Sequence, residues 1–361
     1  MRWSPGIALT AVAMVLTACS GSPTAAPAAA SKGVPASQEA HASQGAHASQ
    51  GAHATQPPSA TWAQWKHLAG VVDVVGPRGD GTFLVAAGKV LFLMGADGSL
   101  RPFARGKGGY EATTTSEPYL ALTGNAAVPG TRCSFRPDTA YAISPAARPE
   151  VIMISPQGQA RPFASLPPGG ALSGIAFDGT GRFGHRLLVT ATFNHRTTVY
   201  SIGCDGHLGT LATGAPPMEG GIAVAPATFG QFGGDLIAPG ELTGQVYAVQ
   251  PSGSVVTLAA SGLPAGQDIG VESAGFVPSA AIAAYLADRR TPGNRHPGDD
   301  ELLRLSAADL ARSGVRAGDL LVASEGGAQT IDVRCGATCT VRYIAAGPAI
   351  AHGEGHIAFL S

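Results

Sequence analysis

Short apolar runs separated by turns recur along the chain from about residue 62. A mainly apolar run, a polar turn containing glycine and a second apolar pair occur together four times, at residues 90–104, 151–164, 199–212 and 246–259. In every copy a large apolar residue follows the turn glycine by five positions. Two apolar segments joined by a short glycine turn are typical of a β-hairpin. The pattern therefore predicts four equivalent hairpins.

The spacing of these hairpins predicts a repeat of four strands. The turn glycines Gly158, Gly206 and Gly253 are 48 and 47 residues apart, which leaves room for two more strands in each unit. Two further pairs of apolar segments repeat in these units: 174–177 with 221–224, and 187–189 with 236–238. Four strands per unit at this period are typical of β-propeller blades. We expect an all-β propeller over residues 61–361. Six blades fit the pattern best, and five or seven remain alternatives.

The last part of the chain departs from this regular pattern. Residues 306–312 predict a short helix, with Ser306 as its N-terminal cap. Two late segments repeat earlier ones: residues 319–333 match 235–249, and residues 354–359 match 219–224. The second match predicts a C-terminal strand in a blade otherwise built from the N-terminus, which would close the ring.

This arrangement resembles the NHL and gluconolactonase-type six-bladed propellers. The resemblance rests on the repeated hairpins and their period, and it covers most of the chain after residue 60. It implies the fold and a channel lined by the innermost strand of each blade. Gluconolactonase-type enzymes use asparagines as metal ligands, whereas Asn125, Asn194 and Asn294 do not lie at matching positions. The resemblance therefore implies no enzymatic residue here.

The first 60 residues have a different character. Residues 1–18 combine Arg2 with an almost wholly apolar stretch, which indicates a secretory signal peptide. Its end, Leu-Thr-Ala before Cys19, resembles the bacterial lipobox, so we expect lipid on Cys19 to hold the protein on the outer face of the cell membrane. The alternative is an ordinary signal peptide. Residues 19–60 are low in charge and carry a six-residue repeat, which predicts a flexible linker.

Composition excludes several classes of protein. Only 13% of the residues are charged and the formal net charge is −1, which excludes a protein that binds nucleic acid by neutralising phosphates. The chain has 50 glycines and 27 prolines but is 45% hydrophobic, which is too apolar for a disordered polypeptide. We further expect a monomer whose partners are an unidentified ligand and, through the lipid, the membrane.

Four cysteines remain beside Cys19, and export favours their pairing in disulfides. Cys335 and Cys339 flank a predicted hairpin turn, where they can form a cross-strand bridge. Cys133 lies in an insertion between the first two hairpins and is left to pair with Cys204. Metal ligation is a weaker alternative because neither pair has zinc-finger spacing.

Repeated glutamates are the main chemical signal in a chain with few charges. They form two sets: Glu219, Glu272 and Glu354 each open a predicted innermost strand, and Glu241 and Glu325 occupy the same turn in two aligned repeats. Carboxylates in a narrow channel repel one another unless a cation lies between them. We therefore assign Glu219, Glu272 and Glu354 as candidate ligands of a divalent cation, Ca²⁺ or Mg²⁺.

Glu241, Glu325 and His356 complete the candidate site as ligand-binding residues. Because side chains alternate along a strand, His356 shares a face with Glu354. The alternative is that the glutamates accept backbone N–H bonds and only join neighbouring blades. Residues 179–184 have the glycine spacing of a dinucleotide-binding loop, but a predicted strand follows instead of a helix, so we interpret them as a strand connection.

These features predict a lipid-anchored extracytoplasmic propeller that binds a protein, a glycan or a small molecule through one end of its channel. A metal-dependent hydrolase or lyase of gluconolactonase type, acting on a sugar-like substrate, is the first alternative. A structural lipoprotein of the envelope is the second. The sequence contains no nucleophile elbow or zinc-protease motif, and a fold alone does not decide between binding and catalysis.

Replacing Cys19 with serine tests the anchor. The Cys19→Ser protein should leave the membrane fraction, because each buried CH₂ of an acyl chain contributes about 0.8 kcal/mol and serine carries no acyl chain. Fractionation followed by a salt wash measures the change, and Ser20→Ala, which keeps the thiol, is the matched control. A Cys19→Ser protein that stays in the washed membrane pellet would show the lipobox interpretation to be wrong.

Overall fold

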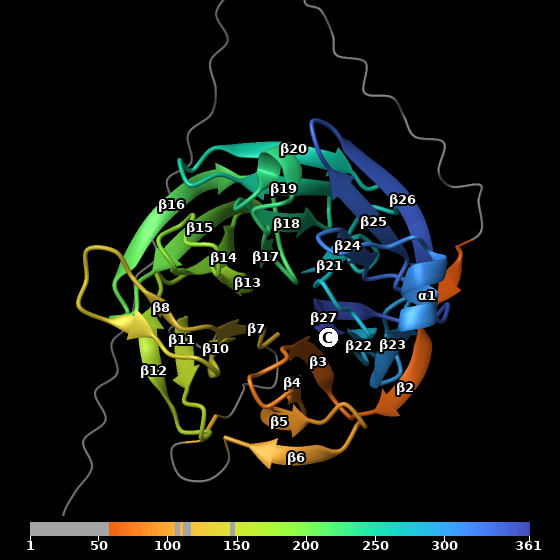
Figure 1. The fold of residues 1–361 in the computed structure, drawn as a ribbon, viewed down its shortest axis with the longest axis horizontal. Coiled ribbons are helices and arrows are strands. Elements are labelled where there is room, and N and C mark those ends of the chain that lie inside the picture. Colours follow the sequence, from red (N-terminus) through yellow and green to blue (C-terminus); the bar gives the residue numbers. More distant parts are fainter. Residues whose placement is uncertain (1–57, 105–108, 111–116, 145–148) are drawn as a thin grey trace, which may run out of the picture. The chain divides into compact units, whose positions relative to one another are not determined.

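The computed structural model describes residues 58–104, 109–110, 117–144 and 149–361. The predicted signal peptide, Cys19 and all but the last few residues of the predicted linker lie outside the described residues. The described residues form a β-propeller with six blades around a central channel (Figure 1). The predicted fold class and the blade count of six are confirmed.

Four blades consist of consecutive antiparallel strands. From the channel outward, the first blade contains β3 (Val71–Val75), β4 (Phe83–Ala87), β5 (Val90–Met94) and β6 (Leu100–Phe103), and the second contains β7 (Leu120–Thr123), β10 (Thr139–Ser144), β11 (Glu150–Ile154) and β12 (Ala160–Ser165). In the same order, the third blade contains β13 (Ala171–Phe177), β14 (Leu187–Phe193), β15 (Arg196–Ile202) and β16 (Leu208–Ala215). The fourth contains β17 (Ala223–Val224), β18 (Leu236–Gly240), β19 (Gln245–Val249) and β20 (Val255–Ala260). The four predicted hairpins are the two outer strands of these blades.

The turn glycines of these hairpins pack against the preceding blade. Gly158, Gly206 and Gly253 have positive φ angles, 85°, 80° and 84°. A Cβ atom on them would lie only 2.7, 2.5 and 2.2 Å from backbone atoms at the outer edge of the blade before. For Gly206 and Gly253 the contacted carbonyls belong to Phe163 and Leu211, the apolar residues five positions after the previous turn glycine. The repeated spacing therefore reflects the contact between successive blades.

The last two blades exchange strands. The fifth contains β21 (Val271–Phe276), β24 (Leu320–Ser324), β25 (Thr330–Cys335), β26 (Cys339–Ala346) and the short parallel β1 (Ala60–Thr61). The sixth contains β27 (Gly353–Leu360), β22 (Ala283–Asp288), β23 (Glu301–Ser306) and β2 (Ala63–His67). After β21 the chain therefore enters the sixth blade for two strands, returns to the fifth, and ends as the innermost strand of the sixth.

Ring closure differs in one respect from the sequence-based expectation. The N-terminal β2 and the C-terminal β27 do share a blade, as its outermost and innermost strands. The two strands between them, however, come from residues 283–306 and not from the N-terminus. The exchanged strand β22 is buried on both faces, as is the equivalent strand β24 of the fifth blade, so its apolar pattern fits either sheet and the strand partners decide between them.

The hydrophobic core is divided among the interfaces between neighbouring blades. Six buried clusters occur, and each draws its side chains mainly from two adjacent sheets. Trp62 and Tyr285 are among the largest buried side chains, and the ring of Tyr285 lies 5.3 Å from that of Phe83 in the first blade. Because every blade buries apolar surface on both of its faces, the closed ring leaves no blade with an uncovered side.

Two short helical segments in the described part of the chain lie outside the blades. The helix α1 (Ala307–Arg312) has the predicted cap: the Ser306 hydroxyl accepts a hydrogen bond from the Asp309 N–H, and the Asp309 carboxylate accepts one from the Ser306 N–H. A second helical turn, η1 (Gly230–Phe232), lies between β17 and β18. The helical segments of the described residues are short, and none could cross a bilayer. Residues 179–184 connect two strands, as expected.

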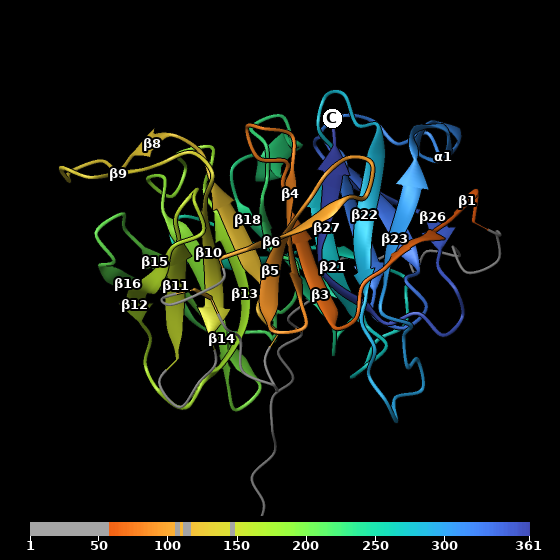
Figure 2. The ribbon, with the colours of Figure 1, turned by 90° about the horizontal axis from the view of Figure 1, so that it is seen from below.

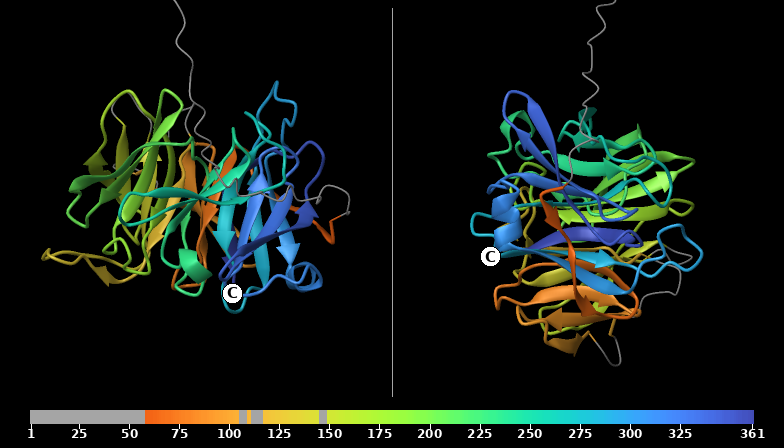
Figure 3. Two further views of the ribbon diagram at one scale, coloured as in Figure 1. Left: turned by 90° about the horizontal axis from the view of Figure 1, so that it is seen from above. Right: turned by 90° about the vertical axis from the view of Figure 1, so that its right-hand side faces the viewer.

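Both predicted cysteine pairs are at bonding distance. The Sγ atoms of Cys133 and Cys204 are 1.98 Å apart, and those of Cys335 and Cys339 are 2.00 Å apart. The first pair ties the inserted hairpin of β8 (Ala126–Ala127) and β9 (Ser134–Phe135), which projects from the ring in Figures 2 and 3, to the third blade. The second pair closes the turn between β25 and β26.

An ion pair at the middle of the channel joins four blades. The Asp73 carboxylate accepts hydrogen bonds from the N–H groups of Val74, Leu120 and His356, at 2.7–2.8 Å, and from the His356 ring at 3.0 Å. The other ring nitrogen of His356 is 3.2 Å from the carbonyl oxygen of Ile175. Burial alone would lower the pKa of His356, but Asp73 outweighs it and raises that pKa above its ordinary value. A protonated His356 donates to both neighbours.

Asp73→Asn tests this central ion pair. Removing one partner of a buried charge pair leaves the other uncompensated, so the free energy of unfolding should fall by roughly 3–5 kcal/mol. Asp205→Asn is the matched control, because the exposed Asp205 accepts only a turn hydrogen bond from the His207 N–H, and it should cost less than about 1 kcal/mol. Urea denaturation measures both values. Equal losses in the two variants would contradict a stabilising role for the pair.

Candidate functional site

Strand ends bring acidic side chains together at one end of the channel. Glu272 and Glu354 are the second residues of the innermost strands β21 and β27, and Glu241 and Glu325 directly follow the equivalent strands β18 and β24. Gly220 passes so close that a Cβ atom there would lie 2.3 Å from the Glu272 side chain. This end carries the loop between β22 and β23, opposite the C-terminus (Figure 2). The acidic residues of the repeats therefore form one cluster.

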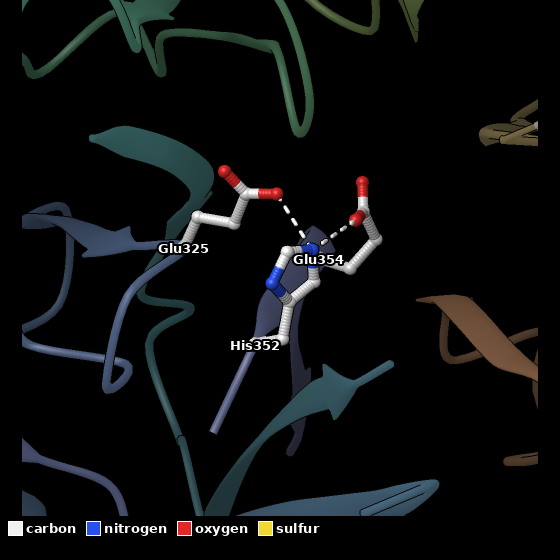
Figure 4. Close-up of side chains that lie close together, drawn as sticks. All are labelled: Glu325, His352 and Glu354. Carbon is white, nitrogen blue, oxygen red and sulfur yellow. Dashed lines mark ion pairs between the residues drawn. The ribbon is translucent and has the colours of Figure 1, made fainter. Parts of the chain in front are cut away.

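One group within the cluster combines an imidazole with two carboxylates. The His352 ring lies between Glu325 and Glu354, with its Nε2 2.6 Å from Glu325 Oε1 and 3.7 Å from Glu354 Oε2 (Figure 4). One ligand atom from each residue lies within 4.8 Å of the others. All three residues are buried: Glu325 is 6% exposed, and His352 and Glu354 are 1% exposed. This spacing would allow the three residues to hold a metal ion.

A second group shares Glu354 and contains its own counter-charge. Ligand atoms of Glu117, Glu272 and Glu354 also lie within 4.8 Å of one another. The Arg289 guanidinium contacts Glu117 and lies 3.4 Å from Glu354 Oε2. The Tyr119 hydroxyl is 2.7 Å from Glu272 Oε1 and also contacts Glu354. Burial, with the surrounding carboxylates, raises the pKa of Tyr119 well above its ordinary value, so that its hydroxyl remains a donor.

In the first group such compensation reaches only the shared Glu354. Within the described part of the chain, Glu325 Oε2 and His352 Nδ1 are buried without a hydrogen-bond partner. The backbone N–H of His352 donates to Asp288 Oδ1 at 2.8 Å, which fixes the residue but leaves its ring nitrogen unsatisfied. A buried polar atom without a partner costs about 1–3 kcal/mol. The imidazole and carboxylates of this group are therefore the part of the cluster that a bound ion would satisfy.

Further carboxyl groups continue the cluster beyond Glu325. The carboxyl group of Glu241 is within hydrogen-bonding reach of those of Glu219 and Glu325. Burial is the main cause that raises the pKa of each of these three groups to about 8. Burial and then the charge of Glu354 raise the pKa of Glu272 well above its ordinary value. At neutral pH the cluster must therefore bind protons or a cation.

The structure joins the candidate residues in a different grouping from that assigned on the sequence. Glu272 and Glu354 lie together, but Glu219 lies beside Glu241 and belongs to neither three-residue group. Glu325 lies next to Glu354 across the His352 ring. His356 lies apart from the cluster, in the ion pair with Asp73.

Four participating residues have no counterpart among the sequence assignments: Glu117, Tyr119, Arg289 and His352. Three of them lie in connections outside the repeated motif, so no match between repeats marks them. Tyr119 differs from these three residues, because it directly precedes the innermost strand β7, whereas Glu272 and Glu354 lie at the start of the innermost strands β21 and β27. A comparison of the starts of all innermost strands could have found it.

Comparisons with known proteins identify no family for this chain. No family model matches the chain, and no curated protein matches it. Solved structures similar to it include a calcium-binding regucalcin from Agrobacterium tumefaciens, with TM-score 0.48, 10% identity and coverage of 84% of this chain and 83% of that chain. Another is a catalytically inactive virginiamycin B lyase from Staphylococcus aureus with quinupristin, with TM-score 0.41, 13% identity and coverage of 79% and 88%.

A gluconolactonase from Xanthomonas campestris is also similar, with TM-score 0.40, 13% identity and coverage of 63% of this chain and 69% of that chain. The six-bladed architecture expected from the sequence is established by the strand pairing of this chain itself. At such low identity the likeness concerns the fold, and the function has to be argued from the residues of this chain.

The raised pKa values predict that the metal-free protein loses stability as the pH rises. Glu219, Glu241 and Glu325 have pKa values of about 8 in the folded protein, against an ordinary value of 4.5. Between these values the folded state binds protons that the unfolded state has released. Their contribution to stability is therefore complete below about pH 4.5 and is lost progressively as the pH rises toward 8.

Urea denaturation in EDTA, from about pH 5 to about pH 8.5, measures this loss. Glu241→Gln removes one titrating group and should make the free energy of unfolding less dependent on pH. Glu150→Gln, in the distant strand β11, is the control and should leave the slope unchanged. A slope that is the same in wild type and Glu241→Gln would contradict the clustered titration.

Proposed function

We propose that the protein binds a divalent cation at the acidic end of its channel and, with it, an extracytoplasmic ligand. The observation that carries the proposal is the buried group of Glu325, His352 and Glu354, in which two polar atoms lack a partner among the described residues. A cation there would satisfy the unpaired oxygen of Glu325 and offset the repulsion between carboxylates. Carboxylate oxygens favour Ca²⁺, Mg²⁺ or Mn²⁺, and the single imidazole adds a ligand that suits transition-metal ions.

Glu325, His352 and Glu354 would be the direct ligands in this proposal. The Tyr119 hydroxyl is hydrogen-bonded to Glu272, and the Arg289 guanidinium offsets the negative charges of Glu117 and Glu354. The group of Glu117, Glu272 and Glu354 therefore already has partners for its carboxylates. Glu241 lies next to Glu325 and would gain from the cation indirectly, because its own carboxyl group would ionise more easily.

The rim of the cluster supports binding of a ligand from solution. The side chains of Glu117 and Arg289 are 41% and 24% exposed, whereas the cluster below them is buried. A ligand with hydroxyl or carboxylate oxygens could reach the rim and complete the coordination of the cation. This supports a binding module for an oxygen-rich partner, which a glycan, a protein carboxylate or a small molecule could supply.

Cleavage of a sugar-like substrate, by hydrolysis or by the elimination reaction of a lyase, is the second candidate function. Carboxyl groups with pKa values of about 8 at Glu241 and Glu325 are suited to proton transfer near neutral pH. The Tyr119 hydroxyl is a positioned donor in the same cluster. Turnover of a panel of lactones that requires a cation and is lost in Tyr119→Phe would favour catalysis, whereas ligand retention without turnover would favour the binding module.

The proposed location of the propeller is the outer face of the membrane, where it could meet extracytoplasmic ligands. Residues 1–60 support export and a lipid on Cys19, which would place the propeller on the outer face of the membrane as a monomer. A tether of about forty residues with random-coil dimensions of about 5–6 Å × √n would let it reach roughly 35 Å from the anchor. This reach supports encounter with ligands beyond the lipid surface.

Cation binding should raise the melting temperature. A ligand at a hundredfold excess over its Kd stabilises the folded state by about 2.7 kcal/mol. Thermal melts in EDTA and then in Ca²⁺, Mg²⁺ or Mn²⁺ measure the change in wild type. Glu325→Gln should abolish most of the response, because it keeps the side-chain shape and removes a ligand charge.

Two controls make this test specific. Glu219→Gln changes a cluster residue outside the proposed ligands and should retain most of the response, whereas Glu150→Gln, remote from the cluster, should retain all of it. A response lost in Glu219→Gln but kept in Glu325→Gln would reassign the ligands. Identical melts of the wild type in every condition would contradict the cation site and favour glutamates that only join blades in an envelope component.

A further inference from the structure

The end of the channel opposite the carboxylate cluster contains a cavity of about 400 Å³. All six innermost strands contribute to its lining, from β3 and β7 round to β21 and β27. Apolar side chains of intermediate exposure border it: Leu122, Phe177, Ala223, Val224 and Phe276. The closed ring therefore leaves an apolar space at this end that the protein itself does not fill.

The floor of this cavity carries no unpaired charge. His356 is the only ionisable side chain among its lining residues, and its ring is bound to the Asp73 carboxylate and the Ile175 carbonyl. The ion pair separates the cavity from the carboxylate cluster on the same strand, where Glu354 precedes His356 by two positions. The two ends of the channel thus offer opposite chemistry.

We propose that this cavity is a second binding site, for a neutral and mainly apolar small molecule with a few hydrogen-bonding groups. Its volume lies within the roughly 300–1,000 Å³ typical of small-molecule sites. The inference is independent of the cation site, because no lining residue belongs to the proposed ligands.

The charge of the occupant follows from its surroundings. An ionised ligand would lose much of its hydration among mainly apolar walls, where no lining side chain among the described residues is free to pair with its charge, a cost that neutral molecules avoid. An anion would in addition face the carboxylate cluster beyond the His356 floor. Backbone groups at the inner edges of innermost strands can bond to hydroxyl, carbonyl or amide groups of a neutral ligand. These conditions select an uncharged molecule with a small polar part.

Titration with the neutral dye N-phenyl-1-naphthylamine tests this site. The full chain with Cys19→Ser, which cannot carry lipid, is used in EDTA so that neither acyl chains nor a cation contributes. The dye should show saturable fluorescence enhancement with one site per chain. Ala223→Phe places a ring in the cavity from β17 and should weaken binding by about tenfold or more, since volume added to an apolar space excludes the occupant.

A second variant and a control keep the result decisive. Leu122→Gln keeps a similar side-chain size but makes the cavity wall polar, so it should also weaken binding. It replaces Ala223→Phe in the test if circular dichroism shows that Ala223→Phe does not fold. Val256→Ser removes an exposed apolar residue on the outer strand β20 and should leave the Kd within about twofold of the parent. Binding that is absent, equal in all variants or lost in Val256→Ser would overturn the proposal.

Discussion

Insertion of the C-terminal strand β27 as the innermost strand of the sixth blade is the constraint on which the rest of the structure depends. The strand pairs with β22 and lies beside both β21 and β3, so that it closes the ring. It also carries Glu354 and His356 to the channel axis, where they lie against Tyr119, Ile175, Glu272 and Arg289 of the second, third, fifth and sixth blades and against Asp73 of the first. Closure of the fold and assembly of the polar channel are therefore one event.

The channel concentrates charge in a chain that has little of it. Only 47 of the 361 residues are charged, 23 basic and 24 acidic, yet five glutamates occupy one end of the channel with two more acidic residues, Glu117 and Asp268, at its edge. One half of this cluster is balanced by Arg289 and by the Tyr119 hydroxyl. The other half contains Glu325 Oε2 and His352 Nδ1, which are unpaired among the described residues, and it is the half in which the proposed cation would bind.

A six-bladed ring naturally has two ends, and here they differ in chemistry. Residues before and at the start of the innermost strands form the acidic end, and residues at the other end of the same strands form the apolar cavity. The Asp73–His356 pair lies between them and contacts four blades, so it both stabilises the ring and separates the two compartments. The two ligands proposed above, one charged and one apolar, would therefore bind in separate compartments.

The sequence alone determined the features that are local or periodic. The hairpins, their glycine turns, the Ser306 cap and the repeat period follow from short-range rules, and the repeat placed Glu272 and Glu354 on equivalent strands. The strand exchange between the last two blades was decided only by tertiary structure, because middle strands buried on both faces carry the same apolar pattern in either sheet. The position of Arg289 likewise required the fold, since it comes from an unrepeated segment whose proximity to the glutamates depends on how the ring closes. His352 is close to Glu354 in sequence, but its contact with Glu325 of the fifth blade also required the fold.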